Sequence, residues 1–321
     1  MADSHSPTSK ADMGASERSA SGSSTPMTVD LSTDRANVDR ELERLCSSPA
    51  LAALPTPIAE AIRYSILGQG KRLRPILMLA AYRACGGEED ASALAACMEV
   101  VHAYSLVHDD LPCMDDDDVR RGRATTHRVY GIAIATAAGV LMVPLAVRAA
   151  CDAGAALGLP NASQAAIVRE LMRASGGGGM VGGQLLDLEG EGSSLSIDQL
   201  ERIHSAKTGA LISASARIGG IAAGANAIGL DALTAYGDAI GLAFQIADDV
   251  LDATSTTAAL GKTAGRDVAL RKSTYPMLLG VDGAIELAAS LVEEACDALE
   301  HAKLRTPILE MLARYAIART S

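Results

Sequence analysis

The chain has 321 residues, of which 49% are hydrophobic, and it carries a formal net charge of -11. This length fits one large domain or two small ones, and the apolar content is sufficient for a large core. With one Phe, no Trp and a great deal of Ala and Leu, the composition favours an all-α fold, because Ala and Leu are strong helix formers. The negative charge argues against nucleic-acid binding, since the chain as a whole repels polyanions.

The first thirty residues differ from the rest in composition. Residues 1–30 are rich in Ser, Thr, Ala and Gly, so we expect a disordered tail, and residues 31–321 are expected to form the folded domain. Asp3, Asp12 and Glu17 interrupt the tail, which argues against a transit peptide. The six cysteines are scattered without a C-x-x-C pair, which favours a reducing compartment such as the cytoplasm.

Apolar residues at helical spacing predict a series of helices joined by short polar turns. In chain order, the expected helices cover residues 38–45, 57–67, 94–107, 129–147, 165–173, 197–221, 230–251, 284–302 and 308–319. Ser196 is expected to cap the helix over 197–221. The segment 129–147 has no charged residue and the length of a membrane span, but we interpret it as a buried core helix. No alternating strand pattern is found.

A dense acidic segment follows the apolar helix over 94–107. Residues 109–118 read D-D-L-P-C-M-D-D-D-D, so six carboxylates fall within ten positions. These carboxylates repel one another unless cations lie among them. Pro112 should end the helix and let the second acidic group turn back towards the first. Oxygen ligands of this kind suit Mg²⁺, although a solvated acidic loop is the alternative interpretation.

A second acidic group consists of Asp248, Asp249 and Asp252. Asp248 and Asp252 are four residues apart, so they share one face of a helix, with Gln245 one turn earlier on that face. Acids in an otherwise apolar helix are costly to bury without a partner. Two acidic groups on two long helices therefore predict a metal site built between helices.

Basic residues accompany both acidic groups. Ordinary surface ion pairs are one explanation, but their repeated position beside the acids favours a diphosphate clamp, because Arg and Lys both bind phosphate oxygens. The basic segments are G-K-R-L-R-P at 70–75, R-R-G-R at 120–123, K-T-G at 207–209, and Lys262 and Lys272 after the second acidic group.

Taken in order, these motifs resemble those of the short-chain trans-prenyl diphosphate synthases, and most of all the bacterial farnesyl diphosphate synthases. The resemblance extends from about residue 57 to the C-terminus. It rests on G-K-R-x-R-P at 70–75, H-A-Y-S-L-V-H at 102–108, D-D-x-x-x-x-D at 109–115, R-R-G at 120–122, G-G-Q at 182–184 with Asp187, K-T-G at 207–209, G-L-A-F-Q-x-x-D-D-x-x-D at 241–252 and K-S-T-Y-P at 272–276.

This resemblance implies a fold and an activity. The fold would be all-α, a single-domain bundle of long antiparallel helices around a central cavity, with residues 31–321 as the prenyltransferase domain. The enzyme would condense isopentenyl diphosphate with dimethylallyl or geranyl diphosphate to give farnesyl diphosphate. It would act as a cytoplasmic homodimer that binds no nucleic acid and is not an integral membrane protein. Roughly three Mg²⁺ ions per site, which Mn²⁺ can replace, would be held by Asp109, Asp110, Asp115, Asp248, Asp249 and Asp252.

The resemblance also assigns roles to the remaining candidates. The allylic diphosphate would be contacted by Arg120, Lys207, Lys262 and Lys272. The diphosphate of isopentenyl diphosphate would be bound by Gly70, Lys71, Arg74, His102 and Arg121. The allylic cation would face Thr208, Gln245 and the carbonyl of Lys207, and Arg319 would help a C-terminal tail close the site. Chain length would be limited by Tyr104 and Ser105, with the aromatic ring of Tyr104 stopping growth at C15.

Several positions depart from the family pattern. Val140 stands where a G-D-A-L run places an acid near the metal site, Ile132 and Thr256 stand where relatives carry acids, and Gln69 replaces a glycine. Loss of a carboxylate that supports a metal site can cost about 10–100-fold in affinity or activity. Alternatives are therefore a geranylgeranyl diphosphate synthase, an impaired homologue acting as a partner subunit, and a magnesium-dependent terpene cyclase. Cyclases usually lack the paired G-K-R-x-R-P and R-R-G clusters.

Overall fold

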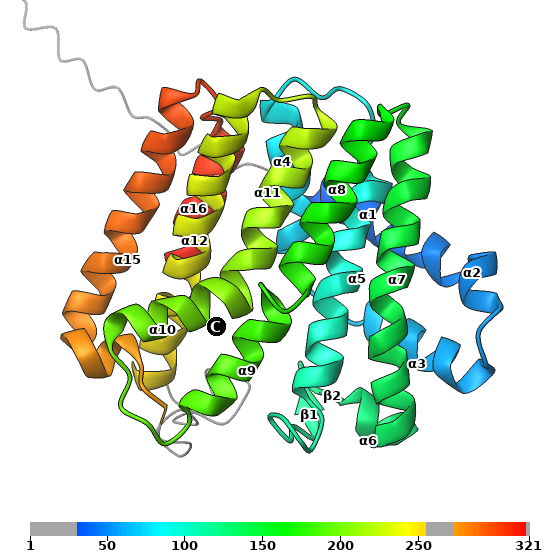
Figure 1. The fold of residues 1–321 in the computed structure, drawn as a ribbon, viewed down its shortest axis with the longest axis horizontal. Helices are drawn as coiled ribbons and strands as arrows, with labels where there is room; N and C mark the ends of the chain where they lie inside the picture. Colours follow the sequence, from blue (N-terminus) through cyan, green and yellow to red (C-terminus); the bar gives the residue numbers. More distant parts are fainter. Residues whose placement is uncertain (1–30, 255–271, 319–321) are drawn as a thin grey trace, which may run out of the picture.

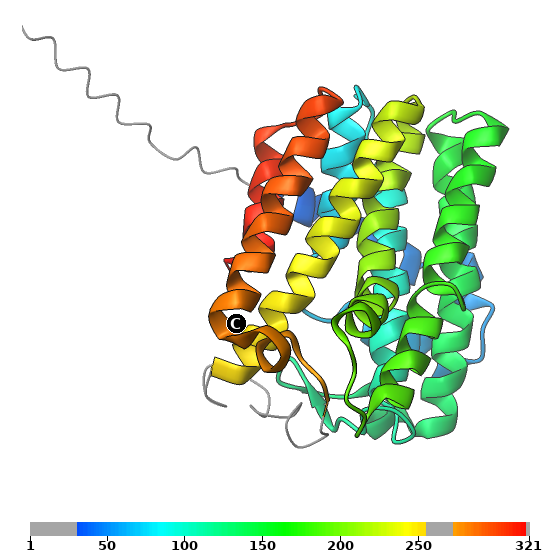
Figure 2. The ribbon, with the colours of Figure 1, turned by 60° about the vertical axis from the view of Figure 1, so that its left-hand side comes forward.

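The protein is described here by a computed structural model that covers residues 31–254 and 272–318 (Figure 1). The expectations for the tail over 1–30 and for Thr256, Lys262 and Arg319 concern residues outside these ranges. Most of the long helices run roughly along one direction (Figures 1 and 2). In the described part of the chain, the only strands are the two-residue pair β1 (Val119–Arg120) and β2 (Arg123–Ala124). The all-α prediction is confirmed.

The helices follow one another with short connections. In chain order they are α1 (Ser32–Cys46), α2 (Pro49–Ala52), α3 (Thr56–Ile66), α4 (Leu73–Ala84), α5 (Ser92–Asp109), α6 (Thr126–Tyr130), α7 (Ile132–Ala156), α8 (Asn161–Ser175), α9 (Met180–Gly190), α10 (Ile197–His204), the π-helical turn η1 (Ser205–Gly209), α11 (Ala210–Ala222), α12 (Ala227–Thr254), α15 (Tyr275–His301) and α16 (Pro307–Ile317).

Local sequence signals explain where the central helices begin and end. Helix α5 ends at Asp109, and Pro112 lies in the turn that follows, as predicted. Ser196 caps α10 through a capping box with Gln199, which confirms the predicted start. The predicted helix over 197–221 is interrupted by η1, where the hydrogen-bonding pattern widens before α11 begins.

Two groups of buried apolar side chains form the core. One is built mainly around α5, α7 and α11, and the other around α12, α15 and α16. Helix α4 joins the two groups, because Met78 and Leu79 belong to the first while Ile76 and Leu77 belong to the second. The lower ends of α5 and α12, together with α9 and α10, lie at the same end of the bundle in Figure 1. The acidic motifs are carried on these ends.

Helix α7 differs from its prediction. We expected a core helix buried all round, but within this chain α7 buries one face and leaves Ile132 and Val140 55% and 57% exposed. It lies at the edge of the bundle beside α8 (Figures 1 and 2). Its lack of charge thus reflects an apolar exposed face rather than a central position. Helices α7, α12 and α15 are long and apolar enough to cross a membrane, by length and composition alone.

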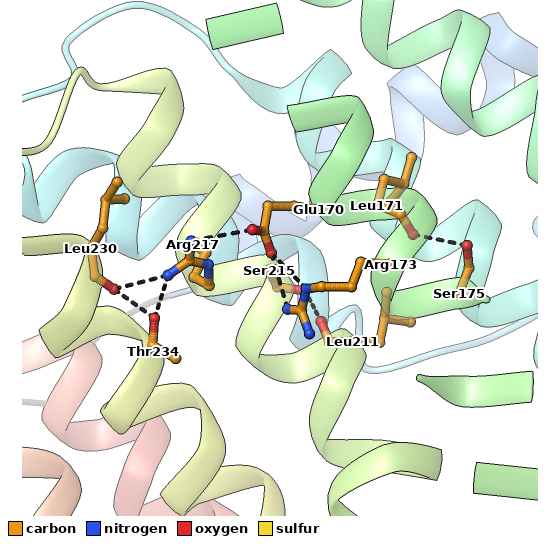
Figure 3. A network of polar contacts seen from close by, with 9 residues as sticks. All are labelled: Glu170, Leu171, Arg173, Ser175, Leu211, Ser215, Arg217, Leu230 and Thr234. Atoms are coloured by element: carbon orange, nitrogen blue, oxygen red, sulfur yellow. Dashed lines mark hydrogen bonds and ion pairs between the residues drawn. The ribbon is translucent and has the colours of Figure 1, made fainter. Parts of the chain in front are cut away.

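A polar network connects α8, α11 and α12 (Figure 3). Arg217 of α11 donates to Glu170 of α8 over 3.2 Å and also to the hydroxyl of Thr234 on α12. Arg173 donates to the other oxygen of Glu170 over 3.0 Å. Since side chains from three helices meet at Arg217, this residue fixes the position of α11, which begins directly after η1.

Candidate active site

A cavity of about 710 Å³ lies among α4, α5, α9, η1 and α12. Described candidates that line it are Gly70, Lys71, Arg74, His102, Ser105, Asp109, Asp115, Arg120, Arg121, Lys207, Thr208, Gln245 and Asp248. An adjoining cavity of about 230 Å³ shares Asp115, Arg120, Lys207, Thr208, Gln245 and Asp248 with it and adds Asp249, Asp252 and Lys272. The fold therefore gathers motifs that extend from Gly70 to Lys272 in the sequence, while Asp110 and Tyr104 lie just outside these walls.

Burial makes ionisation of the first acidic group unfavourable. Burial raises the pKa of Asp109 to about 6; Lys207 and Arg120 oppose this shift, and the charges of Asp115 and Asp110 add to it. Burial also raises the pKa of Asp110, although Arg120 donates its Nε–H to this carboxylate over 2.6 Å. Asp110 therefore anchors Arg120 at the edge of the cavity.

The second acidic group faces the first. Asp248 lines both cavities, while Asp249 and Asp252 are buried in the wall of the smaller one, and Asp249 accepts the backbone N–H of Tyr275 over 3.1 Å. No three His, Cys, Asp or Glu side chains in the described ranges lie close enough to hold an ion by themselves. The donor set nevertheless fits a hard divalent cation that takes further oxygens from a bound phosphate and from water.

A buried ion-pair network supports the G-K-R-L-R-P segment. Arg72 has a left-handed backbone (φ 54°) and donates to Glu99 and Asp39, each over 2.7 Å, and to the carbonyl of Gly68. A Cβ atom at Gly70 would lie 2.9 Å from Nη1 of Arg72 and equally close to Arg121. Only glycine fits there without displacing the arginines. The sequence analysis did not identify Glu99 as a supporting residue. Its one signal in the sequence is that it is a single acidic residue in an apolar helix.

The wall opposite the acids is electropositive. Burial lowers the pKa of His102 well below its ordinary value, and four neighbouring arginines lower it further. Arg121 donates to the backbone carbonyl of Gln69 over 2.6 Å, so the replacement of glycine by Gln69 leaves this contact intact. Lys71 lies 5.8 Å above the ring of Tyr315. A neutral histidine among arginines is suited to an anion with several oxygens.

Asp187 of α9 holds two of the candidate lysines. It accepts from Nζ of Lys207 over 2.6 Å and from Nζ of Lys272 over 2.9 Å. Burial opposes ionisation of Asp187, but the two ammonium groups lower its pKa. Gly183 lets α9 lie against η1, because a Cβ atom there would overlap the backbone of Lys207. The structure thus adds Asp187 as a positioning group, signalled in the sequence only by its place after G-G-Q.

One candidate, Tyr104, and two departures, Val140 and Ile132, lie away from the reaction space. Ser105 lines the larger cavity, whereas Tyr104 is buried, with its ring edge-on to His108 at 4.9 Å. His108 itself contacts the carbonyl of Thr136 on α7, which favours a packing role. Val140 was expected near the metal site, but it lies on the exposed face of α7 with Ile132 and lines neither cavity in this chain.

Comparisons with known proteins agree with this geometry. The profile of the polyprenyl synthetase family matches residues 55–304. The chain is 45% identical over 280 residues to farnesyl diphosphate synthase of Escherichia coli, which covers 84% of this chain and 92% of that protein.

The chain belongs to the polyprenyl synthetase family.

Other members of the family are also similar to this chain. Geranylgeranyl pyrophosphate synthase 9 of Arabidopsis thaliana is 45% identical over 245 residues, covering 75% of this chain and 68% of that protein. The crystal structure of an FPP/GFPP synthase from Zymomonas mobilis superimposes with a TM-score of 0.75 at 33% identity, covering 89% of this chain and 98% of that one. Polyprenyl synthetases need divalent metal ions and use isopentenyl and allylic diphosphates.

Proposed function

We propose that this chain condenses isopentenyl diphosphate with dimethylallyl and geranyl diphosphates to give farnesyl diphosphate, with the help of Mg²⁺. The observation that carries the proposal is a single cavity with two different anion sites. One wall carries the acidic groups of α5 and α12 with Lys207, and the other carries Arg74, His102 and Arg121. A cyclase, which binds one diphosphate, has no use for the second site.

The acidic wall would receive the allylic diphosphate. Asp109, Asp110, Asp115, Asp248, Asp249 and Asp252 would hold roughly three Mg²⁺ ions, which Mn²⁺ can replace. When bound, the metal ions neutralise charge that develops on the departing diphosphate. Arg120, Lys207 and Lys272 would contact its oxygens; the side chain of Arg120 is held by Asp110, and those of Lys207 and Lys272 by Asp187. Lys262, outside the described residues, is proposed to join them.

The basic wall would receive isopentenyl diphosphate. Lys71, Arg74, His102 and Arg121 supply donors, and Gly70 lets the backbone approach the arginines without obstruction. Charge-assisted hydrogen bonds of this kind are short and specific for phosphate oxygens. The second substrate would thereby be oriented with its double bond towards the allylic carbon, which replaces a bimolecular encounter by a fixed geometry.

Bond formation would then take place between the two walls. The C–O bond of the allylic diphosphate breaks, the isopentenyl double bond forms the new C–C bond, and the proton lost goes to the released diphosphate. Thr208 and Gln245, with the carbonyl of Lys207, would present oxygen dipoles to the allylic cation. The apolar surroundings would exclude water, which would otherwise trap the cation as an alcohol.

A product assay tests this function. The purified protein would be incubated with Mg²⁺, isopentenyl diphosphate and a C5, C10 or C15 allylic primer, and chain lengths would be read by mass spectrometry. A C15 product that disappears with EDTA is expected. A C20 product from the same primers would favour the geranylgeranyl alternative. Failure to condense with any primer would refute catalysis and favour a role as a partner subunit.

We also propose that Tyr104 limits the product to C15. Its buried ring lies against His108, and its neighbour in the chain, Ser105, lines the larger cavity. Removing the ring in Tyr104→Ala should open space there, so that C20 or longer products form. An unchanged C15 product from this variant would show that Tyr104 only packs its helix.

The remaining proposals concern the state of the protein in the cell. We infer one prenyltransferase domain over 31–321 that forms a cytoplasmic homodimer without a membrane span. The free thiols of all six cysteines and the exposed apolar face of α7 support this proposal. Light scattering after size-exclusion chromatography without detergent should give twice the mass of 32.9 kDa. A monomer, or protein recovered only in detergent, would contradict it.

A further inference from the structure

We propose that His204 is a positioning residue that fixes two groups of the site at once, the amide of Gln245 and the carboxylate of Asp249. This inference rests on the proposed function, because its consequences are expressed through the cation and metal sites. His204 is the last residue of α10, directly before the π-helical turn that carries Lys207 and Thr208. It is 9% exposed and lines the smaller cavity beside the second acidic group.

Both ring nitrogens of His204 point at residues of α12. Nδ1 lies 3.3 Å from Nε2 of Gln245, and Nε2 lies 3.7 Å from Oδ2 of Asp249. Gln245 and Asp249 are one helical turn apart, so the imidazole spans the distance between them. Asp249 also accepts from the backbone N–H of Tyr275. The ring therefore connects the residue proposed to face the cation with a residue proposed to hold metal.

The donor and acceptor pattern sets the direction of the Gln245 amide. The amide nitrogen can only donate, so Nδ1 of His204 is the acceptor of this contact, and the ring N–H is then at Nε2, facing Asp249. Because the NH₂ end of Gln245 is committed to His204, its carbonyl oxygen is the end left for the cavity. An oxygen is the end of an amide dipole that stabilises a positive charge, whereas an NH₂ group facing the cation would destabilise it.

The ring has little freedom to leave this position. It is stacked on Tyr275 with centroids 5.8 Å apart and an interplanar angle of 28°. Tyr275 is fully buried at the start of α15 and is held by Asp249 through its backbone. Nε2 of His204 has no hydrogen-bond partner within 3.5 Å, so its N–H is available to the Asp249 carboxylate 3.7 Å away.

Amide substitutions can separate the two contacts. In His204→Asn the new side chain reaches about as far as Nδ1, so it retains the contact to Gln245 and loses that to Asp249. In His204→Gln the longer side chain reaches about as far as Nε2, so it retains the contact to Asp249 and loses that to Gln245. His204→Phe keeps a ring on Tyr275 but removes both contacts. His301→Phe, at an exposed histidine of α15, is the matched control.

Two measurements on the full-length protein distinguish these variants. The first is kcat with saturating substrates and Mg²⁺. The second is binding of Mn²⁺ in the presence of inorganic diphosphate, followed by electron paramagnetic resonance, which needs no turnover. We expect His204→Gln to lower kcat about 10-fold or more with Mn²⁺ affinity retained, and His204→Asn to weaken Mn²⁺ binding about 10-fold with kcat largely retained. His204→Phe should show both losses, and His301→Phe neither.

Several results would overturn the inference. One is a His204→Phe protein that is folded by circular dichroism yet keeps kcat and Mn²⁺ affinity within about twofold of wild type. Another is an identical profile for the Asn and Gln variants, which would indicate a structural role alone. If wild type itself has no activity, the proposed function fails, while unequal Mn²⁺ binding by the Asn and Gln variants would still support the contact between His204 and Asp249.

Discussion

Replacing Glu99 by Gln removes one charge from the most buried ion pair described. Glu99 is 4% exposed in the middle of α5, and it accepts from Nη1 of Arg72, which is itself 7% exposed. Breaking a buried pair by removing one partner costs about 3–5 kcal/mol, because the other charge is left without compensation. Here Arg72 keeps Asp39 and the carbonyl of Gly68, and the Gln amide still offers an oxygen. We therefore expect Glu99→Gln to lower the free energy of unfolding by about 2–3 kcal/mol, which is at or below the lower end of the range for a broken buried pair.

The assay is urea denaturation at pH 7 followed by circular dichroism. Glu293→Gln is the matched control, because Glu293 and Arg314 form a pair whose side chains are 59% and 50% exposed. Such surface pairs contribute about 0–1 kcal/mol. If Glu99→Gln cost no more than this control, the Arg72 network would not be what holds the G-K-R-L-R-P segment. The same variant should raise KM for isopentenyl diphosphate, because Gly70 packs directly on this pair.

Three further predictions concern the acidic site and its supports. Burial raises the pKa of Asp109 to about 6, so protonation of this carboxyl group stabilises the fold. This stabilisation is fully present below about pH 4 and is lost as the pH rises through 6. Asp109→Asn should therefore raise the free energy of unfolding of the EDTA-treated protein at pH 7.5 by about 1–3 kcal/mol while abolishing activity; unchanged stability in urea would contradict the shift. Arg217→Met should lower the free energy of unfolding by about 1–3 kcal/mol in the same assay. Arg173→Met loses a more exposed contact to the same carboxylate, so it should cost less than about 1 kcal/mol. Equal losses would refute the role of Arg217 in positioning α11. Gly183→Ala should lower both kcat and thermal stability, because its methyl group would push α9 away from Lys207, whereas Gly177→Ala, with open space at its Cβ, should change neither; a fully active Gly183→Ala enzyme would refute the close contact.

The predictable part of this fold is the part with a local signal. The end of α5 at Asp109 could be read from Pro112, and the start of α10 from Ser196. The two acidic groups could be placed on facing helices because acids in apolar segments need partners. The order of the motifs then predicted that the basic side chains share one cavity. Those in the described ranges line either this cavity or the adjoining smaller one.

The missed elements lack such a signal for identifiable reasons. Helix α4 buries every residue from Pro75 to Tyr82, so it has no polar face and no readable period. Helix α9 begins after four glycines and contains three more, a composition typical of a turn. Glycine is required there because η1 packs against Gly183. Tertiary contact therefore overrides the local preference.

The positioning roles that the sequence did not predict belong to residues that pair over long distances in sequence. Glu99 is 27 positions from Arg72, Asp187 is 20 from Lys207, and His204 is 41 from Gln245. No spacing rule connects such residues, since each pair joins two different segments of the chain. Helix α7 was misjudged for the opposite reason, because an uninterrupted apolar sequence cannot distinguish a central helix from one with an exposed apolar face.

The π-helical turn at Ser205–Gly209 has a consequence for the length of this segment. A π turn corresponds to one residue more than an α-helix needs over the same rise. Deleting Ser205 or Ala206 would allow one uninterrupted helix from Ile197 to Ala222, and this helix would form more readily than the native segment. The flanking helices would stay in phase, because the π turn absorbs the extra residue, but Lys207 and Thr208 lie inside the turn and would shift by up to one position, about 100° around the helix axis, away from Gln245. The count of residues between His204 and Gly209, and not only their identity, is therefore part of the active site.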